Sequence, residues 1–470
     1  MVSRPTTRLE LSGRRFLARR MMHALVRRDV AMFDDPLRAQ SISLASGAVV
    51  SSLVVGVGVV LGLVGIGGVP DSAPIVMGRN SGALYVRVDG ILHPVLNLAS
   101  ARLVARSAAT PVAVADGSIS ALRRGPLMGI PGAPASIGEP LRESTWTVCD
   151  DDDRTVVAVG RSDDDRPDDR SDATRAVLVA PRGEGAAATF LMYDGQRAEV
   201  DLRNLAVVRA LRLDGVAPVP VSRTLLDVVP EVPRIAPPLI ADHGSPGPVS
   251  LSGATIGSVV TVRRADAVER YVVLRDGLQR VGEVAADLIG YAYDTAGRPT
   301  VSVAAAAVAA LPVVDRLPTN SFPRQARTPV GAADGYAVCA RWHQGGTGRI
   351  ASNIAVLVGD SPYRNSVRVT ALAQADGPGP GVDAVAIPAG TVAYVRSARI
   401  VGDDGASGTR FLVTDAGVVF GVRDDDAARF LGLGGPPEAA PWPLLAHLPR
   451  GPELSVDAAS VVRDGLPAAS

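Results

Sequence analysis

One long stretch without charged side chains constrains this chain more than any other feature. Between Arg38 and Asp71 every residue is uncharged, and the run from Ile42 to Val69 is almost wholly apolar, Gly or Ser. At a rise of about 1.5 Å per residue, these 28 residues would form a helix about 42 Å long. A hydrocarbon core about 30 Å thick needs only about 20 residues. The sequence therefore predicts a transmembrane helix over residues 39–70.

The residues that flank this run predict its orientation. The run is longer than the apolar region of a signal peptide and follows a long flank, so we interpret it as a permanent anchor. Residues 1–38 hold nine arginines and four acidic residues, a net charge of +5, and a positive flank stays in the cytoplasm. The sequence predicts a single-pass protein of the plasma (inner) membrane. Its N-terminus is expected in the cytoplasm, and its C-terminal domain in the periplasm or cell-envelope space.

Residues 1–38, expected in the cytoplasm, are predicted to form a basic juxtamembrane helix. Apolar residues such as Phe16, Met21 and Leu25 recur at helical spacing, with arginines on the other faces. Pro36 is expected to end this helix, because proline disfavours helical backbone at the residue before it. Two interpretations stay open: attraction to anionic lipid, and docking to other subunits.

A strand–turn–strand–helix pattern occurs four times after the predicted membrane helix. Glycine accepts the positive φ that a tight turn demands, so Asp-Gly between apolar runs is a strong hairpin signal. The predicted turn residues are Asp89, Gly90, Asp194, Gly195, Asp276, Gly277, Asp415 and Gly417. Helices are expected after the turns at residues 97–105, 201–211, 283–289 and 424–431, with Asn97, Asp201 and Asp424 as N-caps.

The spacing of the four copies predicts how they are arranged. The aspartates of successive turns lie 105, 82 and 139 residues apart, whereas a solenoid keeps a fixed period. The second and fourth copies share a further tail, with Leu225-Leu226 before Pro230 and Leu444-Leu445 before Pro449. We therefore predict an α+β ectodomain of four small repeats around a central β-rich core, with a quasi-two-fold. The alternative is one irregular α+β domain with chance hairpins.

Composition predicts where the segments meet, because stretches rich in Gly, Pro, Asp or Arg read as loops and connectors. The predicted order is the cytoplasmic helix 1–38, the transmembrane helix 39–70, repeat 1 at 71–128, a core segment with an acidic loop at 129–173, repeat 2 at 174–230, a Pro-rich connector at 231–255, repeat 3 at 256–312, a core segment at 313–400, and repeat 4 with the C-terminal tail at 401–470.

The residue types present exclude several chemistries. All 48 basic residues are arginine, and a P-loop needs a lysine that reaches the phosphates. Asp242, His243 and Ser245 are hydrolase residue types, but they lack a G-x-S-x-G elbow and stand in a Pro-rich stretch. The five histidines lack metal-ligand spacing, and the acidic run that begins at Asp150 lacks calcium-loop spacing, so it is expected to be solvated. We predict no catalytic, cofactor-binding or metal site and leave ATP binding open.

The two cysteines predict one disulfide. Cys149 and Cys339 are the only cysteines in the chain, and both lie in the part expected outside the cytoplasm. An oxidising compartment favours pairing. Both also stand in short apolar runs near a tryptophan, Trp146 and Trp342. The alternative is two buried free thiols.

Several short motifs occur from the N-terminus to the middle of the chain: Ser12-Gly13 with Phe16-Leu17 and Arg19-Arg20, Met32-Phe33-Asp34-Asp35-Pro36-Leu37, His93-Pro94-Val95, Gly129-Ile130-Pro131-Gly132-Ala133-Pro134 and Trp146-Thr147 with Cys149-Asp150. Together they resemble the EccB family, the B component of the ESX type VII secretion machine of actinobacteria. The resemblance covers nearly the whole chain. One departure is Arg14, where the family often has tryptophan.

The resemblance implies a structural membrane subunit that scaffolds a type VII secretion channel and its envelope-side assembly. It implies, as partners, the ESX conserved components C, D and E, the mycosin protease, further copies of the chain and membrane lipid. A mildly acidic ectodomain argues against nucleic acid. Two alternatives remain: an envelope-side ATP-hydrolysing subunit, since the family has been described as ATPase-like, and a cell-wall-binding module.

Overall fold

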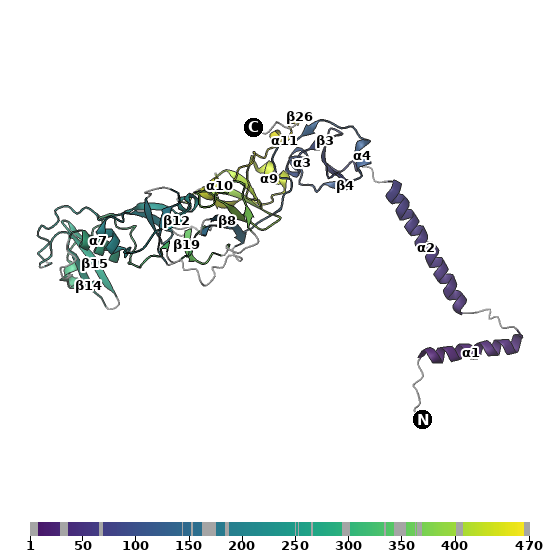
Figure 1. Cartoon of the computed structure of the whole chain (residues 1–470), viewed down its shortest axis with the longest axis horizontal. Coiled ribbons are helices and arrows are strands. Elements are labelled where there is room, and N and C mark those ends of the chain that lie inside the picture. The colour runs from purple at the N-terminus through teal and green to yellow at the C-terminus, as the bar shows by residue number, and fades with distance from the viewer. Residues whose placement is uncertain are drawn as a thin grey trace, which may run out of the picture. The chain divides into compact units, whose positions relative to one another are not determined.

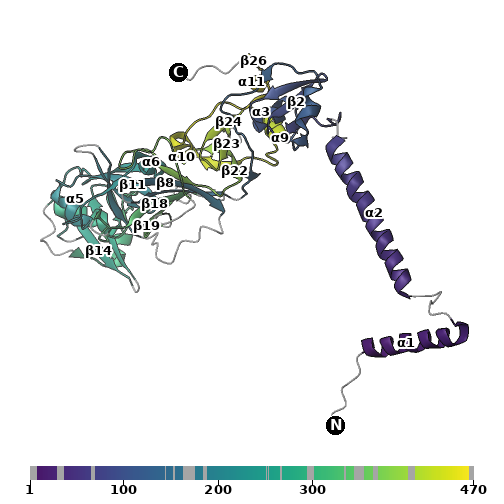
Figure 2. The same ribbon diagram turned by 45° about the vertical axis from the view of Figure 1, so that its right-hand side comes forward.

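The computed structural model (Figures 1 and 2) describes residues 8–28, 36–64, 69–142, 144–151, 154–161, 175–183, 188–249, 251, 253–264, 267–293, 301–332, 335–342, 354–361, 363, 369–400 and 408–464. The chain divides into two compact units. The first comprises Met1–Asp71 with Val114–Ala121, and the second comprises Ser72–Ala113 with Leu122–Ser470.

The first unit consists of helices. Helix α1 (Arg8–Arg27) matches the predicted cytoplasmic helix, α2 (Pro36–Val64) covers most of the predicted membrane segment, and α4 (Asp116–Ser120) is a short third helix. The prediction of a helix through residue 70 is wrong at its end. Residues 69 and 70 are not helical, because Pro70 disfavours helical backbone at the residue before it.

The membrane-spanning prediction is not confirmed by this structure. Among the helices that the structure describes, none has both the length and the apolarity needed to cross a membrane.

The second unit contains five sheets, and four of them share one order of elements. Each begins with three sequential antiparallel strands, continues with a helix, and adds a fourth strand beside the first. The first set is β1 (Ile75–Gly78), β2 (Leu84–Val88), β3 (Ile91–Val95), α3 (Leu98–Val104) and β4 (Val112–Val114); the second is β9 (Val177–Pro181), β10 (Thr189–Tyr193), β11 (Gln196–Val200), α5 (Leu205–Ala210) and β12 (Val219–Val221). The third is β14 (Val259–Arg263), β15 (Val268–Leu274), β16 (Gly277–Val281), α7 (Glu283–Ala292) and β17 (Val301–Ser302); the fourth is β22 (Thr391–Ala398), β23 (Arg410–Thr414), β24 (Val419–Val422), α9 (Asp425–Leu431) and β25 (Glu438–Pro441).

Further elements extend these four sheets. A second helix follows the fourth strand: α4 in the first set, α6 (Arg223–Val228) in the second, α8 (Ala305–Ala309) in the third and α10 (Trp442–His447) in the fourth. The sheets are extended by β5 (Leu127–Met128), β13 (Glu231–Ile235), β6 (Glu139–Pro140) and, after α11 (Val456–Ala459), by β26 (Val462–Arg463). Strand β26 pairs with β5, so residues 462–463 join the first sheet.

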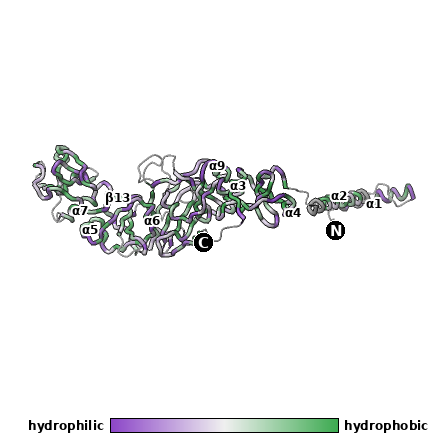
Figure 3. Tube along the Cα trace, turned by 90° about the horizontal axis from the view of Figure 1, so that it is seen from above, coloured by the Kyte–Doolittle hydropathy of each residue, from purple (hydrophilic) through white to green (hydrophobic). Residues whose placement is uncertain are grey.

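The fifth sheet lies at the centre of the second unit. Its strand order is β19 (Ile354–Gly359), β18 (Ala337–Trp342), β7 (Ser144–Asp151), β8 (Arg154–Arg161), β21 (Ala384–Ala386) and β20 (Thr370–Ala371). One face builds the core of the unit, where Trp146 and Val338 pack with apolar residues of the second and fourth sets. Strands β7, β18 and β19 are buried along almost their whole length. Figure 3 shows hydrophobic and hydrophilic residues interspersed along the chain of the second unit.

Helix packing links the sets in pairs. Helix α3 packs on α9, α5 packs on α7, and α6 packs on α10, which lies beside it in Figure 2. Three of the predicted helices begin where expected. The second begins later, because Asn204 caps α5, whereas the predicted cap Asp201 accepts a hydrogen bond from the Arg203 N–H. The predicted α+β class is confirmed.

Candidate functional site

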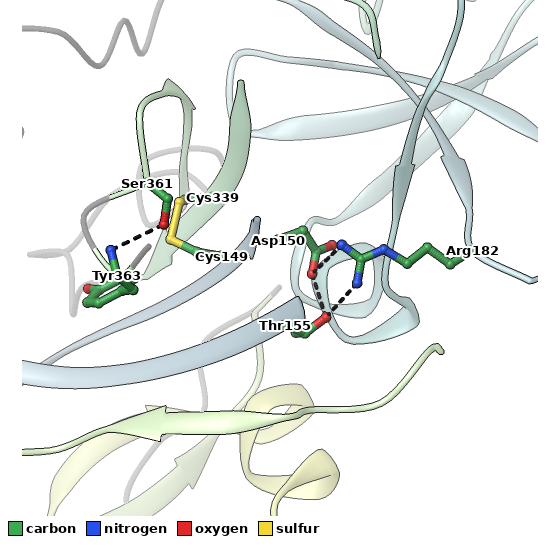
Figure 4. Close-up of a disulfide and its surroundings, with 7 residues drawn as sticks. All are labelled: Cys149, Asp150, Thr155, Arg182, Cys339, Ser361 and Tyr363. Carbon is green, nitrogen blue, oxygen red and sulfur yellow. Dashed lines mark hydrogen bonds and ion pairs between the residues drawn. A yellow bond between two sulfur atoms is a disulfide. The ribbon is translucent and has the colours of Figure 1, made fainter. Parts of the chain in front are cut away.

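The two cysteines are joined at the centre of the middle sheet. Cys149 in β7 stands directly opposite Cys339 in β18, and a disulfide connects their sulfur atoms (Figure 4). Both residues are buried against Leu357, with Ala355 and Tyr363 packed around them. The bond therefore links two strands that lie 190 residues apart in the sequence.

Asp150, the residue after Cys149, is the centre of a buried polar network. Its carboxylate accepts hydrogen bonds from the Thr155 hydroxyl at 2.6 Å and from the Ser222 backbone N–H at 2.6 Å. The Arg182 guanidinium lies 3.8 Å away, and both side chains are almost fully buried (Figure 4). Burial raises the pKa of Asp150, while the positive charge of Arg182 and the two hydrogen bonds lower it.

This network corrects the prediction of a solvated acidic loop from Asp150 onward. Asp150 and Asp151 belong to β7 and are 4% and 3% exposed. Asp150 is buried because its strand neighbour Thr155 and Arg182 of β9 supply a donor and a positive charge inside the protein. The remaining acidic residues of that prediction, from residues 152–153 and 163–169, lie outside the described residues.

The Asp150 network positions a helix that belongs to the second set. Ser222 is the N-cap of α6, and its side chain accepts from the Leu225 N–H while its own N–H donates to Asp150. The other end of α6 carries Asp227, whose carboxylate lies 3.0 Å from Nε2 of His447 on α10. The hydrogen bond with His447 is the main cause that lowers the pKa of Asp227. The tails with the shared Leu-Leu motif thus meet through these two helices.

Beside α6 and α10 lies an open cleft of about 710 Å³ between the second and fourth sets. Arg197 and Arg399 line it, together with Trp442. The Arg197 guanidinium is already engaged, because it donates to the Leu226 carbonyl and pairs with Glu231 at 2.9 Å. No side chain described along this cleft forms a nucleophile–base pair.

The predicted turn residues fall into two groups. Asp89-Gly90 and Asp194-Gly195 form two-residue turns in which all four residues have positive φ, between 45° and 78°. In the fourth set, Gly417 has a φ of 78° and follows Asp415, whose carboxylate accepts from the Gly390 N–H. These residues occupy separate hairpins and are not brought together.

The third set differs from the prediction. Leu274 pairs with Gly277, so the turn consists of Arg275 and Asp276, and Gly277 opens β16. The reason is a close approach of another segment: the Leu278 N–H donates to the Pro312 carbonyl, and a Cβ on Gly277 would lie 2.2 Å from that oxygen. The turn therefore lies one residue earlier than predicted, and Gly277 is required by the strand that follows it.

Replacing Gly277 by alanine should lower the free energy of unfolding by about 2 kcal/mol or more. The new methyl group would displace Pro312, and the backbone φ of 155° is unfavourable for a side chain. Gly434→Ala is the matched control, because a Cβ there meets no atom within 4 Å, and it should change stability by less than about 0.5 kcal/mol. Equal denaturant midpoints for the two variants would contradict this assignment.

The hydrogen-bonded pair of Asp227 on α6 and His447 on α10 has a testable pH dependence. Folding lowers the pKa of the Asp227 carboxyl from its ordinary value of 3.8. Ionised Asp227 therefore stabilises the folded state at pH values above 3.8. This contribution is lost as the pH falls through the lowered pKa. Asp227→Asn should therefore cost up to about 1 kcal/mol near pH 7, since the pair is partly exposed, and nothing near pH 2. Urea unfolding between pH 2 and 7 measures this, with Asp426→Asn on the exposed face of α9 as the control. A cost that does not change with pH would refute the ionic role.

The residues considered for chemistry have structural contacts. The His243 ring stacks on Tyr293 with centroids 4.2 Å apart, and the Asp242 carboxylate pairs with Arg275 at 2.9 Å. Within the described part of the chain, His, Cys, Asp and Glu side chains do not gather in groups of three that could hold a metal ion. The Asp150–Arg182 and Asp227–His447 pairs were not predicted. Only the position of Asp150 directly after the apolar run around Cys149 could have indicated its burial, because β7 is buried from Thr145 to Asp151.

The sequence matches the family described as "Type VII secretion system ESX-1, transport TM domain B" over residues 3–468. It is 34% identical to "ESX-3 secretion system ATPase EccB3" of Mycolicibacterium smegmatis, covering 98% of this chain and 91% of the relative. It is 32% identical to "ESX-5 secretion system ATPase EccB5" of Mycobacterium tuberculosis, covering 98% and 94%.

Solved structures are similar over comparable lengths. A chain of an intact ESX-5 inner membrane complex matches with a TM-score of 0.71 and 30% identity, over 100% of this chain and 98% of that one. A chain of the EccB3 dimer from the ESX-3 core complex matches with a TM-score of 0.68 and 31% identity, over 83% of this chain and 100% of that one.

Proposed function

The chain belongs to the EccB family of type VII secretion components, and we infer that it is a structural membrane subunit of an ESX secretion complex. The observation that carries this inference is the whole-length similarity to a chain of an ESX-5 inner membrane complex. The interior of the second unit agrees with a scaffold role, because its disulfide and buried ion pair hold strands and helices together.

Its partners would be the ESX components C, D and E, the mycosin protease and further copies of itself. A similar chain forms a dimer in the ESX-3 core complex, which supports self-association here. Purification of the tagged chain from its native membrane in mild detergent tests this function. We expect a large complex containing components C, D and E, whereas a tagged chain free of these components would contradict it.

We propose that residues 39–70 anchor the chain once in the inner membrane, with residues 1–38 in the cytoplasm. The uncharged run and the net charge of +5 before it support this topology. A reporter that is active only in the cytoplasm should be inactive when fused after Ser470 and active when fused before Met1. Activity of the C-terminal fusion would overturn the topology.

We also propose that the four similar sets are repeats related in pairs by a quasi-two-fold. In the proposed relation, the first and third sets correspond, as do the second and fourth. The helix packing supports this relation. A two-fold that places α3 on α7 and α9 on α5 turns the α3–α9 contact into the α7–α5 contact, and both contacts are present. The pairing of Cys149 with Cys339 and of α6 with α10 would then lie on the axis.

An ATP-hydrolysing role is the second candidate, because curated relatives carry the word ATPase in their names. The cleft beside α6 and α10 has two arginines and a carboxylate at its wall, Arg197, Arg399 and Asp227. Phosphate release by the purified chain, compared with Arg197→Gln and Arg399→Gln, separates the candidates. Turnover that both variants abolish would favour hydrolysis, and turnover that neither changes would point to a contaminant. Retention on purified peptidoglycan would favour the cell-wall-binding alternative.

A further inference from the structure

The first repeat has a charge opposite to that of the sequence that follows it. Residues 71–128 hold six arginines and three aspartates, a net charge of +3. Residues 129–470 hold 33 arginines and 41 acidic residues, a net charge of −8. A partner that prefers the first repeat on electrostatic grounds should therefore be anionic.

Two of these arginines follow an exposed leucine at one end of the first sheet. Leu122 is 40% exposed, and Arg123 and Arg124 are exposed beside it. The backbone of this segment is fixed, because the Leu92 N–H donates to the Arg123 carbonyl at 3.1 Å and the Gly125 N–H donates to the Leu92 carbonyl at 2.9 Å. One acid, Asp89 in the β2–β3 turn, is exposed at the same end of the sheet. Leu122–Arg124 thus presents an apolar side chain followed by two positive charges.

This segment lies near the point where the chain enters the second unit. The Arg87 N–H donates to the Pro74 carbonyl, and Arg87 pairs with Leu92, which contacts Arg123. From Pro74 to Arg123 these contacts make three steps from one backbone segment to the next. At a spacing of about 4.8 Å per step, Arg123 lies about 15 Å from Pro74. Entry point and basic segment therefore share one end of the first sheet.

The apolar run ends close to that entry point. Val69 is its last residue, and five residues span at most about 17 Å when fully extended. If residues 39–70 cross the membrane, Pro74 must lie within about 17 Å of the bilayer. With Arg123 about 15 Å from Pro74, the tether keeps the basic segment within about 32 Å of the bilayer, a range that includes contact with the lipid headgroups.

We propose that Leu122–Arg124 binds the anionic phospholipid surface on the envelope side of the inner membrane. This inference rests on the proposed anchor. A protein partner would also accept two arginines, but the tether limits the distance to the bilayer and to no other surface, so the observations favour lipid. Each arginine near an anionic surface should change the lipid-bound fraction about fivefold, an effect that salt screens.

The test uses the full chain reconstituted into vesicles, with a polarity-sensitive fluorophore attached to Leu122→Cys. The native cysteines are paired and buried, so the new thiol is the reactive one. Vesicles of phosphatidylglycerol and phosphatidylcholine are compared with pure phosphatidylcholine, each with lipid-borne doxyl quencher. Leu205→Cys on α5, 66% exposed, is the matched control position. Arg123→Gln/Arg124→Gln is compared with the control pair Arg209→Gln/Arg234→Gln, whose exposed arginines lie on α5 and β13.

We expect strong quenching at position 122 in anionic vesicles, a loss of about 25-fold in the contacting population in Arg123→Gln/Arg124→Gln, and no loss in the control pair. Quenching that is absent, equal in neutral vesicles, or seen only when other ESX components are added would overturn the proposal. Alkaline carbonate extraction separates this result from the anchor: a chain that is washed off the vesicles overturns both, whereas a retained but unquenched chain overturns only the lipid contact.

Discussion

Reduction of the Cys149–Cys339 disulfide is expected to lower the free energy of unfolding by up to about 5 kcal/mol. The bond closes a loop of 190 residues, and in the chain-entropy model the stabilisation grows with the length of the closed loop. Cys149→Ala/Cys339→Ala should show the same loss. Reduced wild type is the sharper comparison, because it keeps both side chains and removes only the covalent bond. Guanidinium unfolding with and without reductant measures the difference.

Mass spectrometry provides the control for that experiment. Alkylation of the unfolded chain should modify no cysteine before reduction and two after it. Two modified cysteines without reductant would show free thiols and remove the basis of the prediction. An unfolding midpoint that reduction leaves unchanged would equally contradict it.

Loss of either partner of the buried Asp150–Arg182 pair is expected to cost about 3–5 kcal/mol, because the remaining charge stays buried without its counter-ion. Asp150→Ala leaves Arg182 with the Thr155 hydroxyl at 3.2 Å and the Pro220 carbonyl at 3.4 Å. Arg182→Met leaves the Asp150 carboxylate with the Thr155 and Ser222 donors. Denaturant unfolding of both variants gives the two losses.

A double variant distinguishes an ionic loss from a packing loss. Asp150→Ala combined with Arg182→Met should be less destabilised than the sum of the single variants, since no uncompensated charge remains. Arg423→Met is the exposed control, because Arg423 and Glu453 are both more than half exposed, and it should cost less than about 1 kcal/mol. Additive single losses would show that the two side chains act independently.

The part of this fold that could be predicted from the sequence is local. The helices after the turns depend on nearby caps and apolar spacing, and α7 and α9 begin within one residue of their expected starts. The exception is α5, which Asn204 caps, whereas the predicted cap Asp201 accepts a hydrogen bond from the Arg203 N–H. The Asp194-Gly195 turn is likewise encoded by its own two residues.

The candidate site could not be predicted in the same way, because its contacts join distant segments. Asp150 meets Ser222 and Arg182 only after β7, β9 and α6 have packed, so a run of aspartates looks like a solvated loop in the sequence. The requirement for glycine at position 277 also arises from a distant segment, because a Cβ there would collide with the Pro312 carbonyl. The pairing of Cys149 with Cys339 could be predicted because they are the only two cysteines in the chain and both stand in short apolar runs.

The pairing of β26 with β5 has a consequence for the time at which the protein can fold. Val462 stands opposite Met128, 334 residues earlier, and Leu454 and Ala459 complete a core with Ala99 and Leu103. Synthesis at about 5–20 residues per second takes about 20–70 s to cover this interval. During that time the first sheet lacks its last strand and part of its core. This part of the second unit therefore matures last, although its sequence is made first, and a chaperone that shields exposed strands would be needed there longest.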